Sequence, residues 1–137
     1  MRTNLDKFFK TDKKAQEDGV DFVIREVSDE HEELSFRVRH LTQTNPRVKA
    51  AFAQHYKPFA RLVELGTLPP EKELEINTKI FIDICLVSWK GVEIDGKPAE
   101  CNKENAMQLF RELPELFEQL WKHANDFTHY RVELGNS

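Results

Sequence analysis

The chain has 137 residues, of which 32% are charged and 39% hydrophobic; this balance is typical of one soluble globular domain rather than a disordered chain. Its 24 acidic residues outnumber 20 basic ones and give a net charge of −4, which argues against a nonspecific nucleic-acid binder. No apolar run approaches the roughly 20 residues that cross a bilayer, and the N-terminus lacks the apolar stretch of a secretory signal. We therefore expect a cytoplasmic protein whose partners include neither nucleic acid nor a membrane.

The first 18 residues are polar and rich in lysine, and their apolar anchors are Leu5, Phe8 and Phe9. We interpret residues 1–18 as a polar leader that is extended or partly mobile, and that the Phe pair could dock on the rest of the chain. Residues 19–137 are then expected to form a single domain.

Two stretches after the leader alternate apolar and polar residues. They read "VDFVIREV" and "ELSFRVRHL", and the acidic "SDEHEE" joins them. This period of two predicts a β-hairpin over residues 20–40 with one apolar face. Because two strands alone are marginally stable in water, that face should pack on helices.

Two helices are expected next. Asn45 is a suitable cap and Pro46 a suitable first residue for a helix over residues 46–65, in which Pro58 should cause a kink or break. The second helix, residues 70–89, is apolar almost all round, which is typical of a central helix. Its content of Ile and Val leaves a buried strand over residues 79–87 as the alternative.

The stretch that follows combines a polar loop with two further helices. Asp95-Gly96 is a turn dipeptide, so we interpret the loop as a joint between helices. Asn102 can cap a helix over residues 103–113, and Pro114 begins another over residues 115–127. The expected fold is mainly α, of the α+β class: a small helical domain with an N-terminal β-hairpin packed on it.

Few residues suggest chemistry. Cys85 and Cys101 lack the spacing of a structural zinc site, and no His-Glu-x-x-His motif occurs. Cys101 precedes a predicted helix, whose N-terminus would lower the thiol pKa, and His123 or His129 could act as its base. Any small domain could supply as much. We therefore expect no enzyme, no catalytic residue, no metal ligand and no cofactor.

The aromatic residues are more informative. The chain has ten Phe and two Trp, and most should pack in the core. Some could instead line a groove for an apolar or helical partner. The residues alone therefore predict a mostly helical binding module.

The order of motifs resembles the tail assembly chaperones of long-tailed bacteriophages. The segments that carry the likeness are "NLDKFFKTDKKAQEDG", "NPRVKAAFAQHYKPFARLVELGTL" and "CLVSWKGVEIDGKPAECNKENAMQLFRELPELFEQLWKHANDF". The second contains a Pro-x-x-Arg element, and the third joins a Trp, an Asp-Gly turn and a Leu-Pro-x-Leu-Phe helix pair. The chain departs from the family pattern at Ser88, where an Asp is common, and at "AECNK", where an apolar pair is usual.

This resemblance implies a non-catalytic role in virion assembly. Such chaperones bind the long, aggregation-prone helices of the tape measure protein, and the tail tube protein is a further expected partner. The protein should then act in the host cell cytoplasm and be absent from the mature virion. The expected partner contacts are Trp89, Phe117 and Trp121, together with Pro58 and Arg61 of the Pro-x-x-Arg element. A structural tail or head–tail connector protein that remains in the virion is the alternative.

Overall fold

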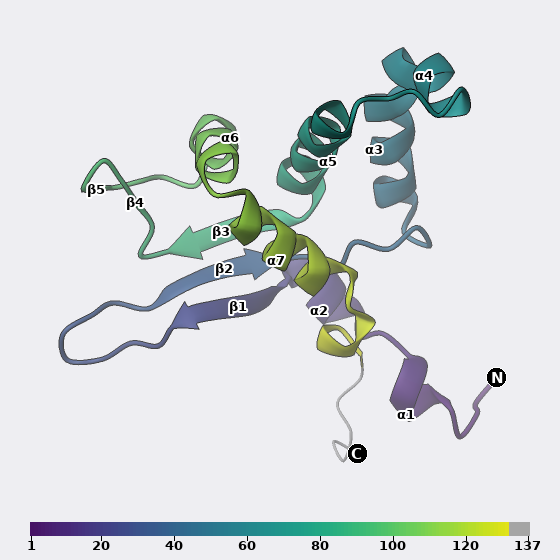
Figure 1. The fold of residues 1–137 in the computed structure, drawn as a ribbon. Helices are drawn as coiled ribbons and strands as arrows, with labels where there is room; N and C mark the ends of the chain where they lie inside the picture. Colours follow the sequence, from purple (N-terminus) through teal and green to yellow (C-terminus); the bar gives the residue numbers. More distant parts are fainter. Residues whose placement is uncertain (132–137) are drawn as a thin grey trace.

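A computed structural model describes residues 1–131 and shows an α+β fold, in which helices pack on a small three-stranded antiparallel sheet (Figure 1). In chain order the elements are α1 (Asp6–Phe9), α2 (Lys13–Asp18), β1 (Val20–Arg25), β2 (Leu34–Val38), α3 (Pro46–Tyr56), the 3-10 helix η1 (Lys57–Phe59), α4 (Ala60–Glu64), α5 (Pro70–Ile84), β3 (Leu86–Lys90), β4 (Glu93–Ile94), β5 (Lys97–Pro98), α6 (Lys103–Glu112), α7 (Pro114–Asn125) and the 3-10 helix η2 (Phe127–His129).

The expected β-hairpin is present as β1 and β2, and β3 extends it to a sheet of order β1-β2-β3. Phe22, Phe36 and Trp89 pair across the three strands, so their side chains share one face of the sheet. α7 lies over this face (Figure 1), and the ring of His123 on α7 meets Phe22 edge-on at 5.4 Å. The hairpin therefore packs its apolar face on helices, as predicted.

The helix expected over residues 70–89 is too long. α5 ends at Ile84, and Leu86–Lys90 form the strand β3. Pairing of β3 with β2 supplies backbone hydrogen-bond partners to an edge that would otherwise stay open. The strand that the Ile and Val content suggested over residues 79–87 is present only from Leu86 onward, since the preceding residues are helical.

The polar loop is therefore a joint between a strand and a helix, which corrects the interpretation as a helix-to-helix joint. Within it, β4 and β5 form a minimal hairpin. Asp95 and Gly96 have φ of 54° and 78°, the positive values that a tight two-residue turn requires. The predicted turn is thus confirmed.

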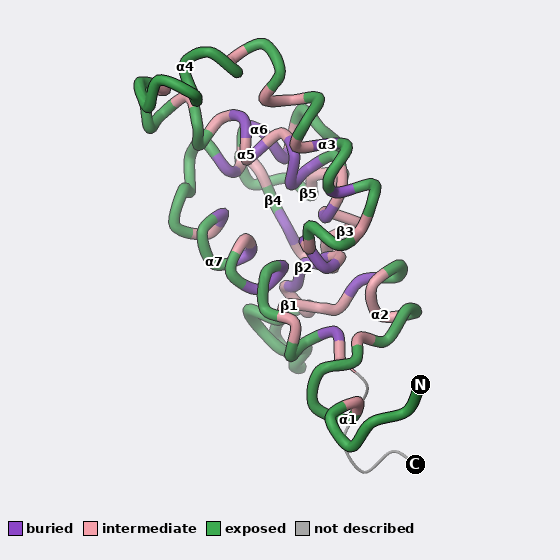
Figure 2. Tube along the Cα trace, turned by 90° about the vertical axis from the view of Figure 1, so that its right-hand side faces the viewer, coloured by how far each residue is buried: buried purple, intermediate pink, exposed green. Residues whose placement is uncertain are grey.

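The first helical segment is broken where Pro58 predicts it. α3 ends at Tyr56, Pro58 lies in η1, and α4 follows. Gly66 ends this segment with φ of 69°, a conformation that glycine adopts without strain. Figure 2 shows α4 exposed, whereas the buried residues lie mainly on β2, α3, α5, α6 and α7.

The core centres on α5, as its broad apolar pattern predicts. Phe81 on α5 is fully buried and meets Phe110 of α6 and Phe117 of α7 edge-on, at 5.9 and 5.5 Å. Such edge-to-face contacts add to the stabilisation that burial alone gives. α5, α6 and α7 are thereby held as one packed unit.

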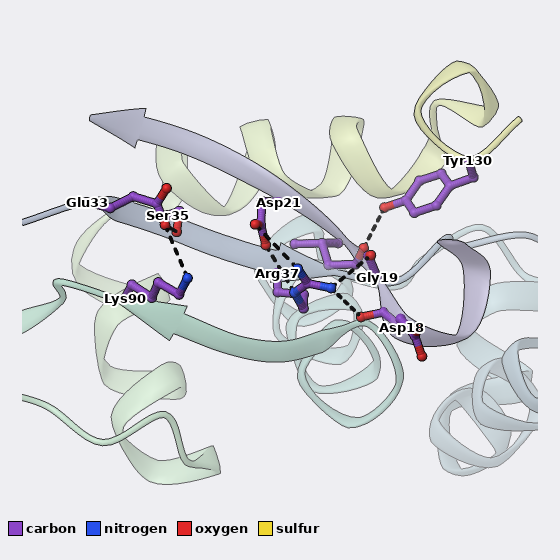
Figure 3. A network of polar contacts seen from close by, with 9 residues as sticks. Asp18, Gly19, Asp21, Glu33, Ser35, Arg37, Lys90 and Tyr130 are labelled. Atoms are coloured by element: carbon purple, nitrogen blue, oxygen red, sulfur yellow. Dashed lines mark hydrogen bonds and ion pairs between the residues drawn. The ribbon is translucent and has the colours of Figure 1, made fainter. Parts of the chain in front are cut away.

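The opposite face of the sheet carries polar side chains (Figure 3). Arg37 pairs with Asp21 at 3.1 Å and donates to the carbonyl oxygens of Asp18 and Gly19. Tyr130 lies on the side of α7, with its ring 6.0 Å from that of His123. Its side chain is fully buried, and its hydroxyl donates to the carbonyl oxygen of Val38 at 2.8 Å. These contacts fasten strand ends, so the cluster needs no catalytic explanation.

The expected leader, residues 1–18, contains α1 and α2. Phe9 stacks on Phe127 at 5.8 Å, and the backbone N–H of Asp12 donates to the carbonyl oxygen of Tyr130 at 2.6 Å. The division of the chain into leader and domain stays a prediction. Of the two phenylalanines in the leader, Phe9 contacts the rest of the chain.

Candidate partner-binding surface

The first half of α5 carries an exposed apolar residue, Leu74, with 45% of its side chain accessible. Leu74 and Pro114 both line two neighbouring cavities that are open to solvent. The cavity toward α7, of about 290 Å³, is lined by Leu74, Asn77, Pro114, Glu115, Phe117, Glu118 and Trp121. The cavity toward α6, of about 340 Å³, is lined by Glu71, Leu74, Glu75, Thr78, Met107, Phe110, Arg111 and Pro114. We call the two cavities together the α5 groove.

The groove follows from how α6 and α7 are joined. α6 ends at Glu112 and α7 begins at Pro114, which lacks an N–H and therefore favours the first position of a helix. Leu113 between them stays 50% exposed. Because the chain turns at this point, neither helix covers the side chain of Leu74.

The structure brings two of the sequence-predicted contacts together at this groove. Phe117 is only 4% exposed and forms part of its floor. Trp121 is half-buried, with its ring 5.7 Å from that of Phe117 and 6.3 Å from that of Phe52. Trp121 is thus the more accessible of the two, while Phe117 supports the surface from beneath.

The other three predicted contacts lie elsewhere. Trp89 is on β3, where its indole N–H donates to the carbonyl oxygen of Ala99 at 2.8 Å and its ring meets Phe36 edge-on. This indole therefore ties the β4–β5 hairpin to the sheet. Pro58 and Arg61 are exposed on η1 and α4, and neither lines the α5 groove.

Sequence reasoning missed Leu74 as an exposed residue, since it treated the helix over residues 70–89 as a central helix that is apolar almost all round. The neighbours of Leu74 carried a usable signal: Glu71, Lys72, Glu73 and Glu75 make the first turns of α5 polar apart from this one leucine. Buried positions of α5 begin only at Ile76.

The surroundings of Cys101 do not lower the pKa of its thiol. Burial raises the pKa of its thiol, and the helix N-terminus is capped by Asn102, whose side chain accepts from the N–H of Asn105 at 2.8 Å. His123 and His129 stack on each other at 4.2 Å. Within residues 1–131, neither imidazole forms a hydrogen bond with Cys101.

Two negative observations hold for the described part of the chain. No three His, Cys, Asp or Glu side chains within it gather into a group that could hold a metal ion. None of its helices combines the length and the apolar character needed to cross a bilayer.

The comparisons with known proteins place the chain among phage proteins. No curated protein and no solved structure is significantly similar to it. The family model of the YdaY prophage protein matches residues 43–134, which is more than half of the chain and runs from just before α3 beyond α7. The chain therefore belongs to the YdaY prophage protein family and is of phage origin.

Proposed function

We propose that this protein is a non-catalytic tail assembly chaperone that binds the tape measure protein during phage assembly. The observation that carries the proposal is the α5 groove, an open and largely apolar surface between packed helices. Membership of a prophage protein family and the resemblance of the motif order to tail assembly chaperones support the same role. On this proposal the protein acts in the host cell cytoplasm and is absent from the finished particle.

The geometry of the groove suits a helical partner. A helix that presents apolar residues at i, i+3, i+4 and i+7 lays them into grooves of this kind. Leu74, Pro114 and Trp121 offer the matching apolar surface. A long helical protein that exposes such stripes before assembly would aggregate without temporary cover.

Co-expression with the tape measure protein of the same phage tests this function. We expect the wild-type protein to raise the soluble fraction of the tape measure protein several-fold and to copurify with it. Leu74→Glu should abolish both effects, because a carboxylate in the groove would have to be desolvated on binding. Val27→Glu is the matched control, since Val27 is also an exposed apolar residue but lies outside the groove, after β1.

Equal solubility of the tape measure protein with and without this protein would contradict the proposal. Mass spectrometry of purified virions then addresses the alternative. A structural tail or head–tail connector protein should be present in stoichiometric amount, whereas a chaperone should be missing.

A further inference from the structure

We propose that the α5 groove selects a basic amphipathic helix, in which lysines or arginines flank the apolar stripe. The proposal rests on the proposed function and adds the chemistry of the segment that the groove recognises. It combines three observations: two adjoining apolar cavities, glutamates along their edges, and the net negative charge of the chain.

The two cavities fit side chains rather than a whole small molecule. Their volumes, about 290 and 340 Å³, lie at the lower end of the roughly 300–1,000 Å³ that ligand pockets occupy. They adjoin at Leu74 and Pro114, which line both. One face of a helix could therefore place one large apolar side chain in each cavity.

The edges of the groove are acidic. Its charged lining residues are Glu71, Glu75, Glu115 and Glu118, against one cation, Arg111. Glu75 pairs with Lys72 and Lys79 at 3.5 and 3.4 Å, and Glu118 pairs with Lys122 at 3.4 Å.

The three lysines and Arg111 equal the four glutamates in number, so the edges attract a further cation only because these ion pairs are weak. They join partly exposed side chains, and ion pairs of this kind are worth little, so an incoming cation can compete for the same carboxylates. Within residues 1–131, Glu71 and Glu115 form no ion pair at all. Lysines or arginines beside the apolar stripe of a partner helix would complement all four carboxylates.

The same charges disfavour a second copy of this chain as the occupant. A twofold contact would set one groove against another, and the glutamates of both would face each other. Like charges brought together at an interface cost binding energy. A partner of opposite charge avoids this cost.

Three synthetic helical peptides with one apolar stripe and flanks of Lys, Gln or Glu test the charge preference. Their binding to the full-length protein is measured by fluorescence anisotropy at low and high salt. We expect the Lys peptide to bind at least about tenfold more tightly than the Glu peptide at low salt, with the Gln peptide between them. The difference should shrink at high salt, because salt screens exposed charges. Equal affinities for the three peptides at low salt would overturn the proposal.

Variants locate the effect. Leu74→Gln should weaken all three peptides alike, and the double variant Glu115→Lys/Glu118→Lys should reverse the order of the Lys and Glu peptides. Glu30→Lys/Glu32→Lys is the matched control, since it makes the same charge change in the exposed β1–β2 connection.

If this control reversed the order equally, overall charge and not the groove would be responsible, and the proposal would fail. It would also fail if light scattering showed a dimer that Leu74→Gln converts to a monomer.

A final comparison separates this inference from the chaperone function. If Glu115→Lys/Glu118→Lys keeps the tape measure protein as soluble as the wild type does, the charge preference is wrong while the chaperone function stands. If the peptides follow the expected order but the wild-type protein leaves tape measure solubility unchanged, the chaperone function is wrong and the charge preference stands.

Discussion

His123 is a polar side chain in an apolar setting. It is 6% exposed on α7, where it meets Phe22 edge-on and stacks on His129. Within residues 1–131 its Nε2 atom has no hydrogen-bond partner. Burial, followed by the neighbouring His129, lowers the pKa of His123 to about 4. The folded protein therefore holds this imidazole neutral at physiological pH.

This neutral imidazole makes stability depend on pH. Between its ordinary pKa of 6.5 and its folded pKa of about 4, the unfolded chain binds a proton that the folded chain does not. The free energy of unfolding should therefore fall as the pH drops through this range, by on the order of 3 kcal/mol. Urea denaturation at a series of pH values across the range measures the slope.

The matched variants are His123→Leu and His31→Gln. The first should flatten much of the slope, and the second should leave it unchanged, because His31 is exposed in the β1–β2 connection. His40, whose pKa burial also lowers, adds to the slope in the same direction. Asp126, whose pKa is lowered mainly by Thr128, loses its contribution only at more acidic pH. A slope in His123→Leu as steep as in the wild type would refute the assignment.

At the scale of elements, the passage from β3 to the β4–β5 hairpin depends on Gly91. Gly91 has φ of 76°, and a Cβ atom there would collide with the carbonyl oxygen of Glu33. Gly66, at the end of α4, has a similar φ of 69° but open space around it. The two glycines thus share a positive φ, which would strain any other residue, and differ in crowding.

Alanine substitutions should separate these two effects. Gly66→Ala carries only the strain of a positive φ, which costs about 1 kcal/mol. Gly91→Ala must also displace the backbone at Glu33, just before β2, so we expect a loss of about 3 kcal/mol or more. Chemical denaturation of both variants measures the difference in unfolding free energy, and equal losses would show that the β3–β4 junction can shift without cost.

Local signals in the sequence were enough to predict most elements. The cap at Asn45, the break at Pro58 and the turn at Asp95-Gly96 each act within a few residues, and the structure confirms them. The end of α5 could not be predicted in this way. β3 pairs with β2, about fifty residues earlier in the chain, and an apolar run does not reveal such a distant partner.

The candidate surface also combines features that local sequence predicts with features that only the tertiary fold determines. Phe117 and Trp121 follow from helical spacing on α7, and the structure brings them together. The exposure of Leu74 depends instead on where α6 and α7 turn, which is a property of the tertiary fold. Trp89 is predicted from the sequence to contact a partner, but in the structure its indole N–H bonds to Ala99 and holds the β4–β5 hairpin.

At the scale of the whole molecule, the two ends of the described chain hold each other. Thr11 and Arg131 form an isolated antiparallel bridge, and Phe9 stacks on Phe127. Figure 1 shows α1 and the last described residues at the same side of the molecule. Further along, Arg39 donates from Nε to the carbonyl oxygen of Glu17 at 2.6 Å. Contacts to the rest of the fold thus extend along the polar segment from Phe9 to Asp18.

Two truncations test whether this segment contributes to stability. Deleting residues 2–11 removes α1 and the contacts of Phe9 and Thr11 but keeps Asp12, whose side chain caps α2; we expect a loss of about 1 kcal/mol. Deleting residues 2–18 also removes the contact of Glu17 with Arg39 and should cost about 2–3 kcal/mol. Denaturation midpoints and hydrogen exchange at Tyr130 measure both effects.

Affinity for the Lys peptide is the control, and it should not change because the α5 groove lies on other elements. If neither truncation shifts the midpoint, the segment is only loosely attached, and the interpretation of residues 1–18 as a mobile leader is the correct one.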